Sequence, residues 1–487
     1  MNASTILHVV SPLGGGVDRY VRDVMASVPR PQVLWHVGER AEVVEGATRD
    51  RRYLPLDPLR IDAAPDALSG WMKSLGIGLV HLHTVVRAPR RRAEWISREL
   101  GVPLLVTLHD VLFLRPDAFD FDAPQADRAW TREVEPVLRE AKGVLTPSTY
   151  VAELAAKTFK GLAVDVVPNG LEPRDATRAP ATARSEFLES RPKRVVAVVG
   201  AIGEHKGADL LRQLPRHLAG SGIGVVVIGY LDRQVYPGWQ ERPHLYVHGP
   251  YHPADTVALL HAYGAELVLF PNRVPESFSY TLSETWDAGL PALAAPAGAI
   301  GERIARHGGG WLLPAGFGAS EVAAEVRRLL APESATELAR VKSRLSLPDA
   351  ARVPTLAAMA ESLDAYYRRY APGYAQPAAS DPAAFDALLA PSLDSSLFRV
   401  ELAHLANICD QSGSSSKRVA EWETEARRWI EKLEGDVASL QQEVKREFEE
   451  RQRLARELAA AQAVAGVANR LPNFVKRILA RIARARG

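Results

Sequence analysis

The amino-acid sequence predicts an α/β protein with two Rossmann-like domains, each built on a parallel β-sheet. Three observations support this fold class. Short apolar runs recur through about the first 370 residues and alternate with helical patterns. These runs are apolar throughout, which is typical of parallel strands that are covered on both faces. A polar stretch rich in Arg, Ala and Pro, residues 172–193, divides the series into two halves and is interpreted as a linker.

Composition excludes several classes of function. The chain has 487 residues, of which 47% are hydrophobic and 24% are charged, as in ordinary soluble proteins of two or three domains. The net charge of +2 gives no basic field for nucleic acid. The single cysteine, Cys409, excludes an internal disulfide framework and fits a reducing compartment. No run has the roughly 20 apolar residues of a membrane span, and the N-terminus lacks a signal-peptide pattern, so we expect a cytoplasmic protein.

The first domain, residues 1–175, opens with an apolar run and a glycine-rich segment at 11–17. Gly15 and Gly16 therefore lie at a strand-to-helix turn, where the backbone can approach a phosphate or a sugar closely. Glycines also serve tight turns that bind nothing, and this alternative stays open. The strand patterns of the domain lie at 6–10, 78–83, 103–107, 142–148 and 165–170.

Three histidines accompany the second and third of these strands. His109 follows the strand at 103–107, and ligands of open α/β sheets bind at the carboxyl ends of strands. Its imidazole can donate a hydrogen bond in the neutral or in the protonated form. His81 and His83 are interpreted as local structure or as lining of a cleft.

The second domain, residues 190–354, begins with a strand at 194–200 and a loop that contains Gly203 and Lys206. The Lys206 ammonium can act as a point charge on a diphosphate. Further strand patterns lie at 224–229, 245–249 and 267–270, and an amphipathic helix is predicted at 251–263.

The segment at 271–296 has the strongest functional pattern. Small residues at 277–281 join the strand at 267–270 to a helix that starts near Leu282 and stops at Gly289. Free N–H groups and the dipole at such a helix start favour an anion. Glu276 precedes this turn and Glu284 lies inside the helix.

The spacing of the two glutamates argues against a glycoside hydrolase. Eight helical residues separate two side chains by about 12 Å, whereas the carboxylates of hydrolases lie about 5–9.5 Å apart. Carboxylates on either side of a ligand suit hydrogen bonds to sugar or ribose hydroxyls. The alternative is that both residues merely complement the helix dipole.

The order Glu276-Ser-Phe-Ser-Tyr-Thr-Leu-Ser-Glu284 resembles the E-x7-E signature of retaining glycosyltransferases of family 4. These enzymes have the GT-B fold, in which two Rossmann-like domains face a cleft. The resemblance implies that Glu284 binds ribose, that Glu276 lies by the donor sugar, and that the amides between them hold the pyrophosphate. His109, Glu276 and Lys206 are the implied catalytic residues. The implied donor-binding residues are Gly15, Gly16, Gly203, Lys206, Gly249, Ser277, Phe278, Ser279, Tyr280 and Glu284.

Two positions depart from the family pattern. Ala201 stands where the family has a phosphate-binding Arg, so another residue must supply the second cation. Arg273 is a candidate, and a solvated Arg273 is the alternative. Gly301 replaces the Pro of a G-G-I-P-E turn at 298–302. We find no D-x-D motif at a plausible place, the resembled family needs no metal, and no cofactor is expected.

The region after Ala371 departs from this family. A crossover helix is predicted at 355–370 and a linker at 371–416. Residues 417–464 have apolar steps of three and four, which predicts a long helix that either forms a coiled coil, and so a homo-oligomer, or packs on the body. Residues 471–487 predict a basic amphipathic helix on an anionic membrane surface, or alternatively a solvated or partner-bound helix.

Together these features predict a retaining glycosyltransferase that moves a sugar from a nucleotide diphosphate sugar to a glycan or lipid-linked acceptor. We expect it at the inner membrane face, in the synthesis of cell-surface polysaccharide. A GT-B phosphorylase or epimerase, and a catalytically weak scaffold of a polysaccharide assembly complex, are the alternatives. The Ala201 departure favours the scaffold, and the intact Glu276/Glu284 pair argues against it.

Overall fold

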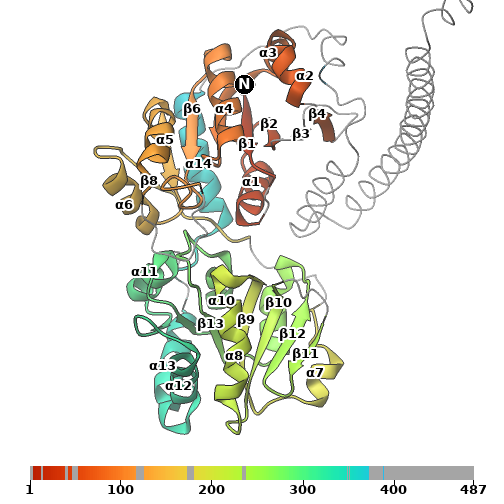
Figure 1. Cartoon of the computed structure of the whole chain (residues 1–487), viewed down its shortest axis with the longest axis vertical. Helices are drawn as coiled ribbons and strands as arrows, with labels where there is room; N and C mark the ends of the chain where they lie inside the picture. The colour runs from red at the N-terminus through yellow and green to blue at the C-terminus, as the bar shows by residue number, and fades with distance from the viewer. Residues whose placement is uncertain are drawn as a thin grey trace, which may run out of the picture. The chain divides into compact units, whose positions relative to one another are not determined.

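The computed structural model describes residues 4–12, 15–38, 42–46, 53–56, 58–116, 126–172, 180–232, 237–347, 349, 351–371 and 388. They form two lobes, each with its own mainly parallel sheet and helices on both faces (Figure 1). The predicted α/β fold with two such sheets is confirmed. The helices predicted at 417–464 and 471–487 lie outside the described residues.

The first lobe contains one eight-stranded sheet. Its strands are β1 (Thr5–Val10), β2 (Gln32–Val37), β3 (Glu42–Glu45), β4 (Tyr53–Leu56), β5 (Ile77–Leu82), β6 (Leu104–Thr107), β7 (Gly143–Thr146) and β8 (Asp165–Val166). Its helices are α1 (Gly16–Ser27), α2 (Pro58–Ala63), α3 (Pro65–Ser74), α4 (Arg87–Leu100), α5 (Arg128–Glu140) and α6 (Thr149–Thr158). The strand order is β4-β3-β2-β1-β5-β6-β7-β8.

The core of this lobe covers both faces of the sheet. Along β1, Leu7 and Val9 join one buried cluster, whereas Ile6 and Val10 join another. Successive side chains of a strand point to opposite faces, so a strand between two buried faces must be apolar at every position. This packing explains why the apolar runs of the sequence do not alternate with polar residues.

The edge of the first sheet differs from the prediction, because β3 and β4 pair in antiparallel fashion. β3 has the sequence Glu-Val-Val-Glu, and both of its glutamates are buried. Arg92 donates to Glu42 at 2.9 Å, and Arg22 donates to Glu45 at 2.9 Å. A buried carboxylate requires such a partner, and the sequence around β3 contains no local sign of either one.

The second lobe contains a seven-stranded sheet. Its strands are β9 (Arg194–Ile202), β10 (Ile223–Leu231), β11 (Gly238–Glu241), β12 (Leu245–Gly249), β13 (Leu267–Phe270), β14 (Ala292–Ala294) and β15 (Gly310–Leu312). Its helices are α7 (Ser185–Glu189), α8 (Ala208–Leu218), α9 (Thr256–Ala262), α10 (Tyr280–Asp287), α11 (Gly298–His307), α12 (Ala319–Leu330) and α13 (Ala335–Leu345), with short 3-10 turns η1 (Glu204–Lys206), η2 (Pro253–Asp255) and η3 (Pro332–Ser334). The strand order is β11-β12-β10-β9-β13-β14-β15, with β11 antiparallel.

A short helix, α7, lies within the segment that the sequence identifies as a linker. Its Phe187 is fully buried, stacks on Trp239 and meets the edge of Tyr263. Burial of this aromatic side chain, together with the hydrogen bond from Trp239 Nε1 to the Glu186 carbonyl at 3.3 Å, holds the segment against the second lobe.

The last described helix, α14 (Leu356–Tyr370), returns to the first lobe and lies beside its strands (Figure 1). Its apolar face, including Met359 and Leu363, joins the same buried cluster as Ile6. The approach is close, since a Cβ on Gly170 would lie 2.4 Å from the Thr355 carbonyl oxygen. Among the described residues, no helix combines the length and the apolar content that a membrane span requires.

Candidate functional site

The loop between β13 and α10 forms the centre of the site. The helix begins at Tyr280, two residues before the predicted start. Ser279 adopts φ +73°, and its hydroxyl accepts a hydrogen bond from the Leu282 N–H at 3.3 Å. A serine in this position satisfies one of the free N–H groups of the first turn. Positive φ is uncommon for a residue with a side chain and marks a strained turn.

Residues 298–302, predicted as a turn, instead form the first turn of α11. This helix start supports the loop before α10. The Ala299 N–H donates to the Glu276 carbonyl at 2.8 Å, and a Cβ on Gly298 would lie 2.8 Å from the Glu276 nitrogen. Only glycine therefore permits this close approach at φ +71°.

Arg303, which the sequence analysis missed, orients the same loop. Its Nη1 donates to the carbonyls of Phe278 and Ser279, both at 3.0 Å, and its Nη2 donates to Ser283 Oγ at 2.7 Å. C=O and N–H point in opposite directions in a trans peptide, so the N–H groups of these peptide units face away from Arg303. Burial lowers the pKa of Arg303 to about 9. No local pattern in the sequence marks this role.

Lys206 and Glu276 meet in front of the second sheet. Lys206 Nζ lies 3.0 Å from Glu276 Oε1, which also accepts from Asn272 Nδ2 at 3.1 Å. The loop after β9 lies close against the segment that follows β13. A Cβ on Gly207, which has φ +85°, would lie 2.4 Å from the Pro271 carbonyl oxygen, so only glycine permits this approach. Gly203 caps the 3-10 turn that carries Lys206, and its carbonyl accepts from the Lys206 N–H at 2.9 Å.

Arg273, the candidate for the cation that Ala201 lacks, pairs with Asp209. Its guanidinium forms two hydrogen bonds to the Asp209 carboxylate, one of them from Nε at 2.9 Å. Both partners are exposed. The pair therefore holds Arg273 on the surface of the second lobe.

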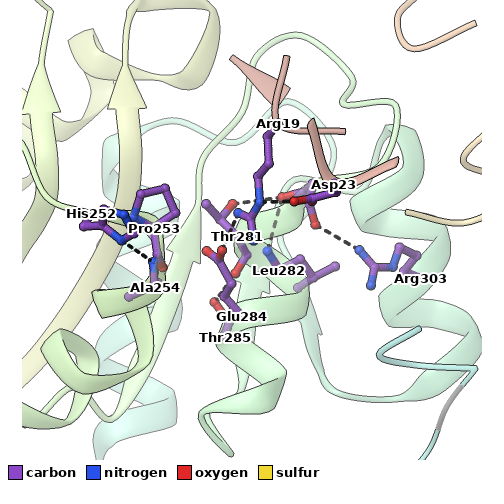
Figure 2. Close-up of polar contacts among 12 residues, drawn as sticks. Arg19, Asp23, His252, Pro253, Ala254, Thr281, Leu282, Glu284, Thr285 and Arg303 are labelled. Carbon is purple, nitrogen blue, oxygen red and sulfur yellow. Dashed lines mark hydrogen bonds and ion pairs between the residues drawn. The ribbon is translucent and has the colours of Figure 1, made fainter. Parts of the chain in front are cut away.

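Arg19, also missed by sequence reasoning, brings a cation from the first lobe to α10. Its Nη1 lies 2.6 Å from Glu284 Oε1 (Figure 2). Its guanidinium carbon lies 4.3 Å from the centroid of the Tyr280 ring. Asp23 lies 3.8 Å from Arg19 Nε. Burial lowers the pKa of Arg19, but Glu284, Tyr280 and Asp23 outweigh burial and raise it above its ordinary value. A Cβ on Gly16, at the start of α1, would lie 3.9 Å from the same Tyr280 ring.

The Tyr280 hydroxyl is buried and has no hydrogen-bond partner within the described part of the chain. Burial also raises the pKa of Tyr280 well above its ordinary value, so the hydroxyl keeps its proton. Most buried hydroxyls have a hydrogen-bond partner, so the Tyr280 hydroxyl is a candidate contact for a bound ligand.

Two more contacts join the lobes beside this loop. The Ser277 hydroxyl donates to the carbonyl of His109, and the Tyr150 N–H donates to Glu302 Oε2 at 2.7 Å. The His109 ring is buried and packs edge-to-face with Tyr20, with ring centroids 4.4 Å apart. Burial lowers the pKa of His109 to about 3, so the neutral form predominates near pH 7.

The remaining predicted residues lie at the margins of this arrangement. Gly15 caps α1 at φ +75°, and its carbonyl accepts from the Arg19 N–H at 3.1 Å. Gly249 ends β12 at φ +89°. Two residues later, burial and then the neighbouring Glu284 raise the pKa of Tyr251, so this segment lies within electrostatic reach of α10.

His8, His81 and His83 lie close enough to consider a metal. Their candidate ligand atoms all lie within 4.8 Å of one another. Each of their six ring nitrogens is already hydrogen-bonded to another side chain. A metal would have to displace these bonds, so we interpret the cluster as a hydrogen-bonded network.

Comparison with protein families agrees with this geometry. Residues 14–175 match the model of Glycosyltransferase Family 4, and residues 181–344 match the model of Glycosyl transferases group 1. The chain is a glycosyltransferase of the GT-B type. A search of curated proteins gives no match.

Solved structures of low sequence identity share the fold of this glycosyltransferase. Sucrose-phosphate synthase from Thermosynechococcus elongatus has a TM-score of 0.55 at 16% identity, covering 75% of this chain and 98% of its own. The Anabaena protein HepE, in complex with UDP-glucose, has a TM-score of 0.54 at 17% identity, covering 76% and 100%. A glycosyltransferase from Rickettsia africae has a TM-score of 0.53 at 14% identity, covering 76% and 99%. The predicted GT-B fold is confirmed.

Proposed function

We propose that this glycosyltransferase transfers a sugar from a nucleoside diphosphate sugar to a glycan or lipid-linked acceptor, with retention of configuration. The observation that carries the proposal is the Glu284 carboxylate on α10, directly behind a loop whose N–H groups are turned away from Arg303. A helix start with free amides suits the diphosphate, and a carboxylate one turn later suits the ribose hydroxyls. The UDP-glucose in the structure of HepE supports a donor of this class.

In this proposal the two cations come from different lobes. Lys206 approaches the leaving diphosphate from the second lobe. Arg19 approaches from the first lobe and takes the role for which Ala201 is unsuited. Positioned cations stabilise the charge that develops on a departing diphosphate. Glu276 and His109 orient the sugar, and the proposal needs no metal.

The cellular role follows from the class of acceptor in this proposal. A lipid-linked or glycan acceptor places the enzyme in polysaccharide synthesis, in the cytoplasm or at the inner membrane face. The basic helix predicted at 471–487 would supply the membrane contact, and the helix predicted at 417–464 would supply oligomerisation. Flotation of the full chain and of a chain lacking 471–487 with anionic liposomes tests the membrane contact, because equal recovery of both would reject it.

The central test measures nucleotide binding and donor turnover in Glu284→Gln. UDP and GDP are titrated in a thermal-shift experiment, and UDP-glucose and GDP-mannose are the donors for turnover. Loss of charge-assisted hydrogen bonds to ribose should weaken nucleotide binding about 10- to 100-fold. Glu302→Gln is the matched control, because Glu302 also accepts an interlobe hydrogen bond but lies outside the proposed donor site.

Equal nucleotide affinity in wild type and Glu284→Gln would show that Glu284 does not bind the nucleotide, and the proposed donor site would be rejected. The stereochemistry is read separately, from the anomeric configuration of the product by NMR. The scaffold alternative, which the Ala201 departure favours, predicts that no donor is turned over. A phosphorylase or epimerase would consume its substrate without any dependence on a glycan acceptor.

A further inference from the structure

A line of hydrogen-bonded side chains crosses four neighbouring strands of the first sheet. Gln32 begins β2, His8 lies in β1, His83 follows β5 and His109 follows β6, in the spatial order of the strands. Gln32 Oε1 lies 2.9 Å from His8 Nε2, and His8 Nδ1 lies 2.9 Å from His83 Nε2. His83 Nδ1 lies 3.1 Å from His109 Nε2. All three histidines are buried.

The first member of this line has a fixed orientation. Gln32 Nε2 lies 3.2 Å from the Met25 carbonyl and 3.0 Å from the Val28 carbonyl, at the end of α1. Carbonyls only accept, so the amide NH2 group must face them and Oε1 must face His8. A flipped amide would place its oxygen against two other oxygens, which settles an assignment that X-ray data alone often leave ambiguous.

The orientation of the Gln32 amide fixes the position of the proton on each histidine of the line in turn, because a neutral imidazole has one donor and one acceptor nitrogen. Gln32 Oε1 accepts, so His8 Nε2 must carry the proton and His8 Nδ1 must accept. His83 Nε2 then donates to His8, which leaves His83 Nδ1 to accept from His109 Nε2. Burial lowers the pKa of His8 to about 4 and the pKa of His83 well below its ordinary value, so the neutral forms that the scheme requires are present near pH 7.

We propose that Gln32 is a positioning residue that sets the tautomer of His109 through His8 and His83. His109 keeps its proton on Nε2 and offers Nδ1 only as an acceptor. Tyr20 packs against the His109 ring in an edge-to-face arrangement and restrains it in this orientation. His109 would therefore select a ligand group that donates, such as a sugar hydroxyl, and would not bind a phosphate oxygen through Nδ1. Only this last consequence rests on the proposed function.

The test is a long-range proton–nitrogen correlation spectrum of the full chain, labelled with 15N-histidine. His109→Asn identifies the His109 signals by their disappearance. The expected wild-type pattern is a protonated Nε2 and an unprotonated Nδ1 for His8, His83 and His109. A proton on Nδ1 of His8 or of His109 would overturn the proposal, and this result requires no substitution of Gln32.

Variants of Gln32 test its control of the line. Gln32→Met removes the acceptor and should convert His109 to a mixture of both tautomers. Gln213→Met is the matched control, since Gln213 also donates to a helix carbonyl, that of Asp209, but lies in the second lobe. A wild-type His109 pattern in Gln32→Met would refute the role of Gln32.

Donor kinetics separate this inference from the proposed function. KM for the donor should rise in Gln32→Met by the inverse of the fraction of His109 that keeps the wild-type tautomer, about twofold for an even mixture, and should stay unchanged in Gln213→Met. If the spectrum changes as expected while KM stays the same, the tautomer control stands and the contact of His109 with the donor fails.

Discussion

Lys206 Nζ lies 3.0 Å from Glu276 Oε1, so the loops after two neighbouring strands are joined by an ion pair at the carboxyl edge of the second sheet. The sequence places these residues 70 positions apart. Both side chains are partly exposed, and exposed pairs contribute little to stability. We therefore interpret the pair as part of the donor site, where Lys206 can exchange Glu276 for a diphosphate.

Replacement of Lys206 tests this interpretation. Lys206→Met should lower donor turnover roughly 100-fold, because one positioned cation no longer stabilises the departing diphosphate. Arg273→Met removes the same charge from a residue that is held by Asp209, and its turnover should stay near that of wild type. Steady-state kinetics with a nucleotide sugar provide the measurement. Similar losses in both variants would indicate a general effect of surface charge.

Arg303 should be required for both stability and binding. Arg303→Met leaves the carbonyls of Phe278 and Ser279 without their donor, which should lower the free energy of unfolding by about 2 kcal/mol or more and weaken nucleotide binding. Arg306→Met, on the exposed side of the same helix, should change stability by less than about 0.5 kcal/mol. Urea unfolding and nucleotide titration check both values. A stable Arg303→Met variant with normal nucleotide binding would show that the loop before α10 keeps its orientation without Arg303.

Gly289 and Gly298 both adopt φ +71°. Alanine substitutions at these two positions distinguish the effect of backbone strain from the effect of displacing a residue of the site. Gly289 has open space around its missing Cβ, whereas a Cβ on Gly298 would collide with Glu276. Backbone strain alone should lower stability by about 1–2 kcal/mol in Gly289→Ala, and the collision with Glu276 should add to this loss in Gly298→Ala. Only Gly298→Ala should also lower turnover, by at least about tenfold, because it displaces Glu276. Thermal unfolding and kinetics are measured on both variants, and equal turnover in the two would contradict this role of Gly298.

The pH dependence of donor binding should reflect the ionisation of the Asp23 carboxyl group. Burial raises the pKa of Asp23 to about 7, against the opposing effect of Arg19. The carboxylate is therefore neutral below pH 7 and charged above it, where it repels a diphosphate. KM for the donor should rise about threefold as the pH increases from 6 to 8, the effect of one unit charge several ångströms away in a solvated site.

Asp23→Asn should keep the low-pH value of KM at every pH, because its side chain does not ionise. Asp62→Asn is the control, since Asp62 is an exposed carboxylate of the same lobe that pairs with Arg92. A pH profile of Asp23→Asn that matches wild type would assign the change to another group.

The sequence predicts those parts of the site that are local in the chain. Strand β13, the small-residue turn and helix α10 follow one another, so the positions of Glu276, Ser279 and Glu284 follow from local propensity and from the capping preference of a helix start. The apolar runs likewise predict both sheets, because strands that are covered on two faces must be apolar at every position. Local patterns cannot reveal β3, whose buried glutamates depend on Arg22 and Arg92.

The tertiary structure alone decides which distant side chains meet. Arg19 reaches Glu284 across 265 positions, and Arg303 of α11 reaches the carbonyls of the loop before α10. Gln32 is linked to His109 only because β2, β1, β5 and β6 are neighbours in the sheet. No periodicity encodes these pairs, since they depend on strand order and on the docking of one helix against another. Propensity therefore determines the elements and the anion-binding turn, whereas packing determines which charges and hydrogen bonds complete the site.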